Sequence, residues 1–262
     1  MRQFPPRRLI CLTEETVETL YLLGEQDRIV GVSGYAVRPP EVRLKPRVSA
    51  FNSARLDKIL ALKPDLVLAF SDLQADIVSD LAKSGVAVHL FNQRDLAGIF
   101  AMIRTLGALV GVGDKAEALA RSLEARIMGV ARAGRGSAKG AARRPRVYFE
   151  EWNDPMISAI GWVSELIEVA GGEEVFAHLR SAAGARERIV SSEAVIAARP
   201  DVILASWCGR KVVPRQIAER PGWALLPAVV QGRIVEIKSA LILQPGPAAL
   251  TDGLDAIRAA LK

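Results

Sequence analysis

The chain has 262 residues, half of them hydrophobic, and a formal net charge of +6 at neutral pH. This length holds one large α/β domain or two domains of roughly 130 residues, with enough apolar content for a core without metal or disulfides. The two cysteines fall in opposite halves without metal-ligand spacing, and no apolar run approaches the roughly 18 residues of a membrane span.

The positive charge is concentrated near the middle of the chain. Seven basic residues and no acidic one lie between Ala125 and Phe149, so the remainder is close to neutral. The Gly/Ala/Ser-rich stretch 135–145 predicts a basic, flexible loop, with contact to an anionic surface or membrane as the alternative. It has no aromatic residue on which a base could stack, which argues against nucleic acid.

Strands and helices alternate in the first half of the chain. Apolar runs predict strands at 8–13, 28–32, 65–70 and 86–91, and helical patterns predict helices at 15–23, 56–63, 73–84 and 95–110. A proline-rich loop is expected at 33–46. This alternation is typical of a parallel sheet covered on both faces, so we expect an N-terminal α/β lobe over residues 1–112.

A long helix is expected at the centre, over residues 113–134. Leu119, Leu123 and Ile127 recur at steps of four and lie on one face, and Gly134 suits a C-terminal stop. A helix of this length spans roughly 30 Å. We interpret it as a strut that joins two lobes.

The second half repeats the pattern of the first and predicts a C-terminal α/β lobe over residues 146–262. Strands are expected at 146–150, 202–206 and 233–237, and helices at 161–170, 192–198, 213–220 and 247–261. An internal echo supports a repeat, because LDKILALKPDLVLAFS at 56–71 matches SEAVIAARPDVILASW at 192–207.

The echo places an acid, Asp57 or Glu193, in the first turn of each short helix. A contact with the helix dipole, worth a few tenths to about 1 kcal/mol, explains either acid alone. It does not require matching acids in both lobes, whereas a partner surface with two-fold-like symmetry does. Both interpretations stay open at this point.

Ligands of parallel sheets bind beyond the carboxyl ends of the strands. In the first half Tyr35, Phe51 and Phe70 lie at such positions, and we expect them to line a cleft, with core packing as the alternative. From the second half we expect aromatic and polar lining by Glu150, Trp152, Trp162, Trp207, Cys208, Arg210, Lys211 and Gln244. Such a site suits a large, flat, amide-bearing ligand, whereas Arg38 would suit a carboxylate-bearing one.

No catalytic set is recognisable, so the sequence predicts a protein that is not an enzyme and holds no metal. His89 and His178 lack a second ligand at metal spacing. Cys208 is the one candidate for chemistry, since Arg210 and Lys211 could lower its pKa, although a cleft-lining role suits it better.

Several segments together resemble a known family. They are RIVGVSGY at 28–35, the PDLVLAF element, GDKAE at 113–117, GWVSELIEVAGGEEVFA at 161–177, IVSSEAV at 189–195, GRIVEI and QPGPAALTDGL at 244–254. In order and spacing they resemble the substrate-binding proteins of ABC importers for vitamin B12, ferric siderophores and heme, most closely the cobalamin-binding branch.

The resemblance implies two Rossmann-like α/β lobes with parallel sheets, joined by a single long helix. It implies a monomer that binds a cobalamin-like corrinoid in the cleft between the lobes, as ligand and not as catalyst, and delivers it to an ABC permease. It also implies that Asp57 and Glu193 dock onto arginines of that permease. The chain departs from the branch at Val37-Arg38-Pro39, where Asp-Tyr-Pro is usual.

Alternatives remain for ligand and location. A ferric siderophore or heme could replace the corrinoid. The family is periplasmic or otherwise extracytoplasmic, but the apolar run at 9–12 is too short for the core of a signal peptide. We therefore keep a second hypothesis, a cytoplasmic corrinoid-handling or sensing protein without a permease.

Overall fold

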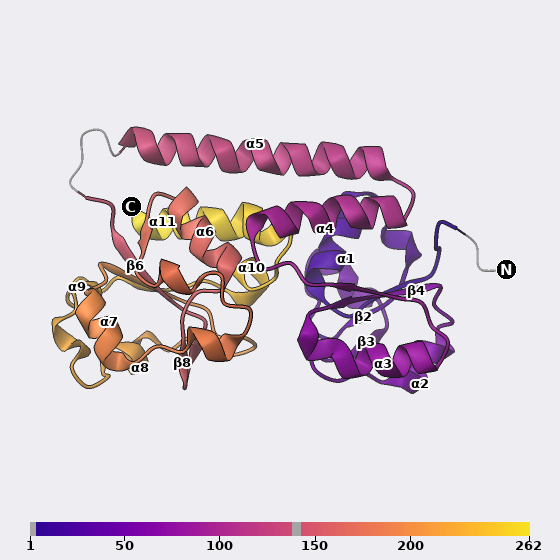
Figure 1. Ribbon diagram of the computed structural model, residues 1–262, viewed down its shortest axis with the longest axis horizontal. Helices are drawn as coiled ribbons and strands as arrows, with labels where there is room; N and C mark the ends of the chain where they lie inside the picture. The colour runs from indigo at the N-terminus through magenta and orange to yellow at the C-terminus, as the bar shows by residue number, and fades with distance from the viewer. Residues whose placement is uncertain (1–3, 138–142) are drawn as a thin grey trace. The chain divides into compact units, whose positions relative to one another are not determined.

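The computed structural model describes residues 4–137 and 143–262 (Figure 1). The chain divides into two compact units. We call the unit of residues up to Gln93 and Ala97–Ser122 the N-terminal lobe, and that of Arg94–Leu96 and Leu123–Lys262 the C-terminal lobe. Among the described residues no helix is both long and apolar enough to cross a membrane.

The N-terminal lobe contains a parallel sheet of five strands in the order β3-β2-β1-β4-β5. The four predicted strands are confirmed, three of them shorter than predicted and β2 shifted by one residue, whereas the strand β3, directly after the predicted proline-rich loop, was missed. The strands are β1 (Leu9–Cys11), β2 (Ile29–Ser33), β3 (Arg47–Ser49), β4 (Leu66–Phe70) and β5 (Val88–Phe91).

Helices cover both faces of this sheet, as the alternating pattern predicted (Figure 1). They are α1 (Glu14–Leu22), α2 (Leu56–Ala61), α3 (Ala75–Lys83) and α4 (Leu96–Leu109). Ile59 of α2 and Leu81 of α3 pack with Ile10 and Val67 in one core cluster. Side chains alternate across a strand, so Leu9 and Cys11, also fully buried, face the opposite side.

The long central helix, α5, extends from Gly113 to Ser137. Its residues up to Ser122 belong to the N-terminal lobe and the rest to the C-terminal lobe. The helix passes through Gly134, which is not among the glycines with positive φ, so the predicted stop was wrong. Residues 135–137 of the predicted basic loop are therefore helical, and its part at 138–142 lies outside the described residues.

The C-terminal lobe contains a parallel sheet of four strands in the order β11-β10-β6-β9. The three predicted strands are confirmed, whereas the two-residue β9 was missed. A small antiparallel hairpin of β7 (Trp152–Asn153) and β8 (Met156–Ile157) was also missed. The sheet strands are β6 (Arg146–Glu150), β9 (Glu173–Glu174), β10 (Val202–Ala205) and β11 (Ile234–Glu236).

The four predicted helices of this lobe are present. They are α6 (Gly161–Val169), α7 (Ser192–Ala198), α8 (Pro214–Ala218) and a helix from Pro247 that passes through a π turn at Ala249–Gly253 into α11 (Leu254–Leu261). Two short helices, α9 (Pro227–Val230) and α10 (Ser239–Ile242), were not predicted. In Figure 1, α6 and α11 lie on one side of the sheet and α7 and α8 on the other.

The internal echo in the sequence is a repeat of topology. Strands β5-β4-β1-β2 of one lobe follow the same order as β11-β10-β6-β9 of the other. The repeated aspartate, Asp65 or Asp201, joins the starts of two neighbouring strands in each lobe. The Asp65 carboxylate accepts the backbone N–H of Arg8 at 2.9 Å, and the Asp201 carboxylate accepts that of Arg146 at 2.7 Å.

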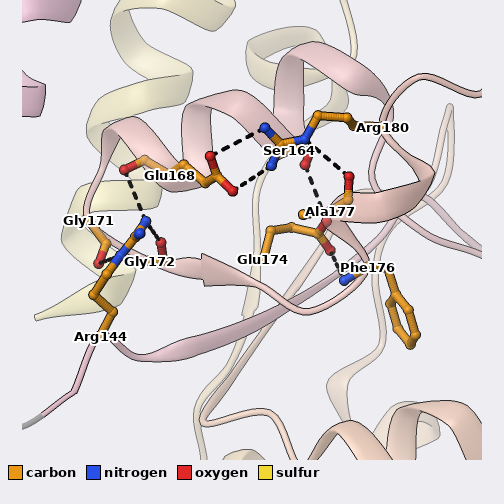
Figure 2. Close-up of polar contacts among 9 residues, drawn as sticks. All are labelled: Arg144, Ser164, Glu168, Gly171, Gly172, Glu174, Phe176, Ala177 and Arg180. Atoms are coloured by element: carbon orange, nitrogen blue, oxygen red, sulfur yellow. Dashed lines mark hydrogen bonds and ion pairs between the residues drawn. The ribbon is translucent and has the colours of Figure 1, made fainter.

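The edge strand β9 is fixed to α6 by buried polar contacts (Figure 2). The Glu174 carboxylate accepts the Ser164 hydroxyl at 3.2 Å and the Phe176 N–H at 3.0 Å. Burial raises the pKa of Glu174 to about 7. Arg180 pairs with Glu168 of α6 at 2.5 Å. The buried contacts of Glu174 explain how a strand of two residues keeps its place, and the Arg180–Glu168 pair adds a surface contact between α6 and the segment after β9.

Candidate ligand-binding site

Tyr35 lies in the turn after β2, at the carboxyl end of the N-terminal sheet. Its side chain is 51% exposed, and its backbone N–H donates to the Ser33 hydroxyl at 3.3 Å. The turn is held against the end of β3, because the Gly34 N–H donates to the Ser49 carbonyl at 2.7 Å. Tyr35 therefore presents an aromatic surface at the end where parallel sheets bind ligands.

The other two predicted aromatics of this lobe differ from each other. Phe51 is half-buried, whereas Phe70, the last residue of β4, is only 5% exposed and packs within the lobe. Gln74, which the sequence analysis missed, connects them. Its Nε2 donates to the Phe51 carbonyl at 2.9 Å, and its Oε1 accepts the Phe70 N–H at 3.0 Å.

The loop between Phe70 and Gln74 is also conformationally unusual. Ser71 has a φ of 65°, which a residue with a side chain rarely adopts. Its hydroxyl accepts the Leu73 N–H at 3.3 Å and its own N–H donates to the Phe91 carbonyl at 2.8 Å. Strained backbone of this kind persists where the surroundings fix it, often near binding sites.

Three glutamates follow the central strand β1 of the same sheet: Glu14, Glu15 and Glu18. Glu15 is 1% exposed; one carboxylate oxygen accepts the Thr13 hydroxyl, and the other, Oε2, has no hydrogen-bond partner among the described residues. Burial raises the pKa of Glu14 to about 8 and that of Glu15 to about 7. None of these acids was among the site residues predicted from the sequence.

The sequence suggested that Arg38 could bind a carboxylate-bearing ligand, but in the structure Arg38 already pairs with a carboxylate of the protein. Its guanidinium pairs with Glu18 of α1, at 3.2 Å from Nη2 and 3.3 Å from Nε. The ion pair is part-buried. The cation expected for ligand binding thus neutralises one of the three acids.

In the C-terminal lobe the predicted anchor Glu150 is fully buried and both of its carboxylate oxygens are paired within the lobe, which contradicts a role in direct ligand contact. Its carboxylate pairs with Arg220 at 2.5 and 3.0 Å. It also accepts the Trp207 indole N–H at 3.1 Å and the Tyr148 hydroxyl at 3.2 Å. Trp207 is 2% exposed and packs in one hydrophobic core cluster with Tyr148, so it offers no surface to a ligand.

Trp162 is a second correction. It lies in the first turn of α6, is 2% exposed, and donates its indole N–H to the Ile242 carbonyl at 2.8 Å. A carbonyl of α10 thus satisfies the only polar atom of the side chain. Trp162 packs inside the lobe instead of lining a cleft.

The remaining predicted residues of this lobe keep accessible surface. Trp152 of the β7–β8 hairpin is half-buried, and the Arg210 guanidinium carbon lies 5.5 Å from the centre of its ring. Cys208 and Lys211 are exposed in the same loop after β10, and Gln244 is half-buried. A flat aromatic surface with a stacked cation suits a large planar ligand that carries an anionic group.

Asp57 and Glu193 are both exposed, as a docking role requires. Asp57 pairs with Arg55 at 2.9 and 3.1 Å, a contact that the sequence analysis did not predict, and this hydrogen bond lowers its pKa. Glu193 has a lowered pKa, first because of a hydrogen bond to its own backbone and then because of Ser191. Docking itself stays a prediction.

The described residues hold no group of three or more His, Cys, Asp or Glu side chains that could bind a metal ion. The two candidate histidines lie beside aromatic rings: His89 is 4.3 Å from Phe91 and His178 is 6.2 Å from Phe176, centre to centre. Partial burial lowers the pKa of His89. Structural roles account for both.

Known proteins resemble this chain over nearly its full length. It is 26% identical to an uncharacterised ABC transporter substrate-binding lipoprotein, YvrC, of Bacillus subtilis, over 95% of this chain and 78% of that protein. It is 27% identical to a vitamin B12-binding protein of Vibrio parahaemolyticus, over 95% of this chain and 88% of that protein.

Among solved structures, the apo form of a periplasmic heme-binding protein, RhuT, from Roseiflexus sp. RS-1 superimposes with a TM-score of 0.82. The two chains are 26% identical, and the match covers 98% of this chain and 99% of that one. The likeness confirms the predicted fold class, two α/β lobes with parallel sheets and one long helix. Residues 9–241 match the family described as periplasmic binding protein, and the chain therefore belongs to that family, as a substrate-binding protein of the vitamin B12, heme and siderophore class.

Proposed function

We propose that this protein binds a cobalamin-like corrinoid without chemically changing it and delivers it to an ABC permease outside the cytoplasm. The similarity to a vitamin B12-binding protein supports the ligand, but the similarity to a heme-binding protein is equally strong. The choice between a corrinoid and heme as the ligand therefore depends on the side chains at the carboxyl ends of the strands.

The observation that carries the proposal is the Trp152–Arg210 pair. A half-buried indole with a guanidinium 5.5 Å from its centre forms a flat apolar surface bordered by positive charge. A corrinoid combines a large planar ring system with a single phosphodiester, so one face and one cation can serve it. Lys211 follows Arg210 directly and adds a second positive charge.

Calorimetric titration with cyanocobalamin, hemin and a panel of ferric siderophores tests this function. We expect saturable 1:1 binding of cyanocobalamin, and a loss of about fivefold in affinity in Trp152→Ala, the scale of one aromatic contact. Saturation by hemin or a siderophore, with none by cyanocobalamin, would reject the corrinoid.

Leu225→Ala is the matched control in the same lobe. Leu225 is a largely exposed apolar residue just before α9. This region lies at the amino end of the sheet, because the Ala228 N–H donates to the carbonyl of Pro200, ahead of β10. Cyanocobalamin affinity should not change in this variant, and an equal loss in both variants would count against the Trp152 surface.

A further inference from the structure

The start of α1 occupies the ligand-binding end of the N-terminal sheet. Strand β1 is the middle strand of the five, and Thr13, Glu14 and Glu15 follow it after the single residue Leu12. In a parallel sheet this position, beyond the carboxyl end of a central strand, is where ligands bind. Acidic residues at this position are therefore candidates for ligand contact, whereas acidic residues at the start of other helices are explained by the helix dipole alone.

Glu15 carries a hydrogen-bond acceptor that the lobe leaves unused. The hydroxyls near it are already committed: Thr13 Oγ1 donates to Glu15 Oε1, Thr16 Oγ1 to the Thr13 carbonyl and Thr19 Oγ1 to the Glu15 carbonyl. Oε2 is buried and has no partner among the described residues. A buried polar atom without a partner is unfavourable, and a bound donor would remove that cost.

The charges around Glu15 favour a ligand that donates hydrogen bonds. Glu14 keeps part of its surface exposed, and it lies close enough to Glu15 and Glu18 for their charges to raise its pKa, although burial is the larger cause. The neighbouring cation, Arg38, is paired with Glu18. Lys45 and Glu15 both influence the pKa of Cys11 electrostatically. The Lys45 ammonium group donates a hydrogen bond to the Gln26 carbonyl at 3.0 Å.

We propose that Glu14 and Glu15 form an acceptor subsite for the N–H groups of a primary carboxamide on the ligand, and that this subsite discriminates against a carboxylate at the same position. The inference rests on the proposed function and gives its recognition chemistry. A carboxamide brings two N–H donors to the glutamate oxygens. Burial raises the pKa of Glu14 to about 8 and that of Glu15 to about 7, so the titrations are run at pH 9, where both side chains are ionised. At that pH a carboxylate of the same shape brings only acceptors and a like charge, so it meets both repulsion and unpaired oxygens.

Corrin rings carry primary carboxamides around their rim, whereas heme carries carboxylates, so the subsite provides a direct test of ligand class. The probes are cyanocobalamin and its monocarboxylate derivatives, in which one peripheral amide has been hydrolysed. We expect the wild-type protein to bind cyanocobalamin at least tenfold more tightly than the derivative hydrolysed at the amide that reaches Glu14 and Glu15. The other monocarboxylates should bind almost as well as the amide.

The variants are Glu14→Gln, Glu15→Gln and the double variant, which keep the side-chain shape and remove the charge. We expect the preference for amide over carboxylate to fall to about threefold or less in the double variant. Asp76→Asn, which removes one exposed charge from α3, is the control and should keep the full preference. Far-UV circular dichroism establishes that each variant is folded.

The outcomes separate the two proposals. If the wild type binds cyanocobalamin and the double variant keeps its preference for the amide, the subsite is wrong while the proposed function stands. If the wild type shows no preference among the derivatives, the subsite is likewise wrong. If cyanocobalamin does not bind at all and hemin does, the proposed function fails first.

Discussion

The buried ion pair of Glu150 and Arg220 allows a sharp test of what holds the C-terminal lobe together. Glu150 is fully buried, and Arg220 contributes its two shortest hydrogen bonds, 2.5 and 3.0 Å. Arg220→Met keeps the apolar stem of the side chain and removes the charge. Among the described residues, the carboxylate then retains the side-chain donors of Trp207 and Tyr148, both neutral.

We expect Arg220→Met to lower the free energy of unfolding of this lobe by about 3–5 kcal/mol, the usual cost of leaving a buried charge without its partner. Loss of the stacking between Arg220 and the Trp223 ring, 4.7 Å apart, accounts for up to about 1 kcal/mol of this. The double variant with Glu150→Gln should recover at least half of the loss, because the neutral amide can accept the Trp207 indole N–H through its oxygen and donate through its NH2 group to the Tyr148 hydroxyl.

Urea unfolding followed by tryptophan fluorescence measures this lobe selectively, because all four tryptophans lie in it. Arg215→Met is the control: Arg215 forms a 2.6 Å pair with Glu219 in and just after α8, but both side chains are largely exposed. Such a pair contributes about 0–1 kcal/mol. Equal losses for Arg220→Met and Arg215→Met would refute the argument that burial sets the magnitude.

Three further predictions follow from the same contacts. Asp65→Asn removes the charged acceptor of the Arg7 and Arg8 backbone N–H groups, both at 2.9 Å, and should lower the unfolding temperature of the N-terminal lobe, at a cost of about 1–2 kcal/mol measured by calorimetry. The pKa of Glu15 is raised to about 7 in the folded state, so its stabilising contribution is complete below the unfolded pKa near 4.5 and disappears as pH rises through 7. The free energy of unfolding of the wild type should therefore fall between pH 5 and pH 9, and this fall should be smaller by roughly 3 kcal/mol in Glu15→Gln. The same pH dependence in both proteins would contradict the raised pKa of Glu15. The double reversal Asp57→Lys with Glu193→Lys should leave ligand affinity unchanged and abolish salt-sensitive docking to the cognate permease in vesicles; docking that persists would leave both acids as helix-dipole partners.

The architecture was predictable because its elements are long enough to show a period. Every helix or strand expected from the sequence is present, and strand β6 and helix α7 have the expected bounds. Strands β3 and β9 were missed because three and two residues are too few for an alternating pattern. The hairpin of β7 and β8 lies in a segment where no apolar period exists.

Side-chain roles were harder to predict than the elements that carry them. The position of Trp162 at the start of α6 and of Trp207 after β10 is compatible with either a cleft wall or a core. What decides between them is a partner distant in sequence: the Ile242 carbonyl for one indole and the Glu150 carboxylate for the other. A sequence pattern does not contain such partners.

The converse error concerns Glu14 and Glu15. Acids in the first turn of a helix are common, because they interact favourably with the helix dipole. Only the fold shows that this helix follows the middle strand of its sheet and that a carboxylate oxygen there is buried without a partner. The run TEE could have been singled out, since it follows the first buried strand of a predicted parallel sheet.

The repeat is therefore one of scaffold and not of chemistry. Asp65 and Asp201 serve the same structural purpose in the two lobes, joining the starts of adjacent strands. At the opposite ends of those strands the lobes differ: one presents glutamates, with Arg38 already paired, and the other presents Trp152 with Arg210. The two surfaces therefore differ in chemistry although the strands that precede them are arranged in the same order.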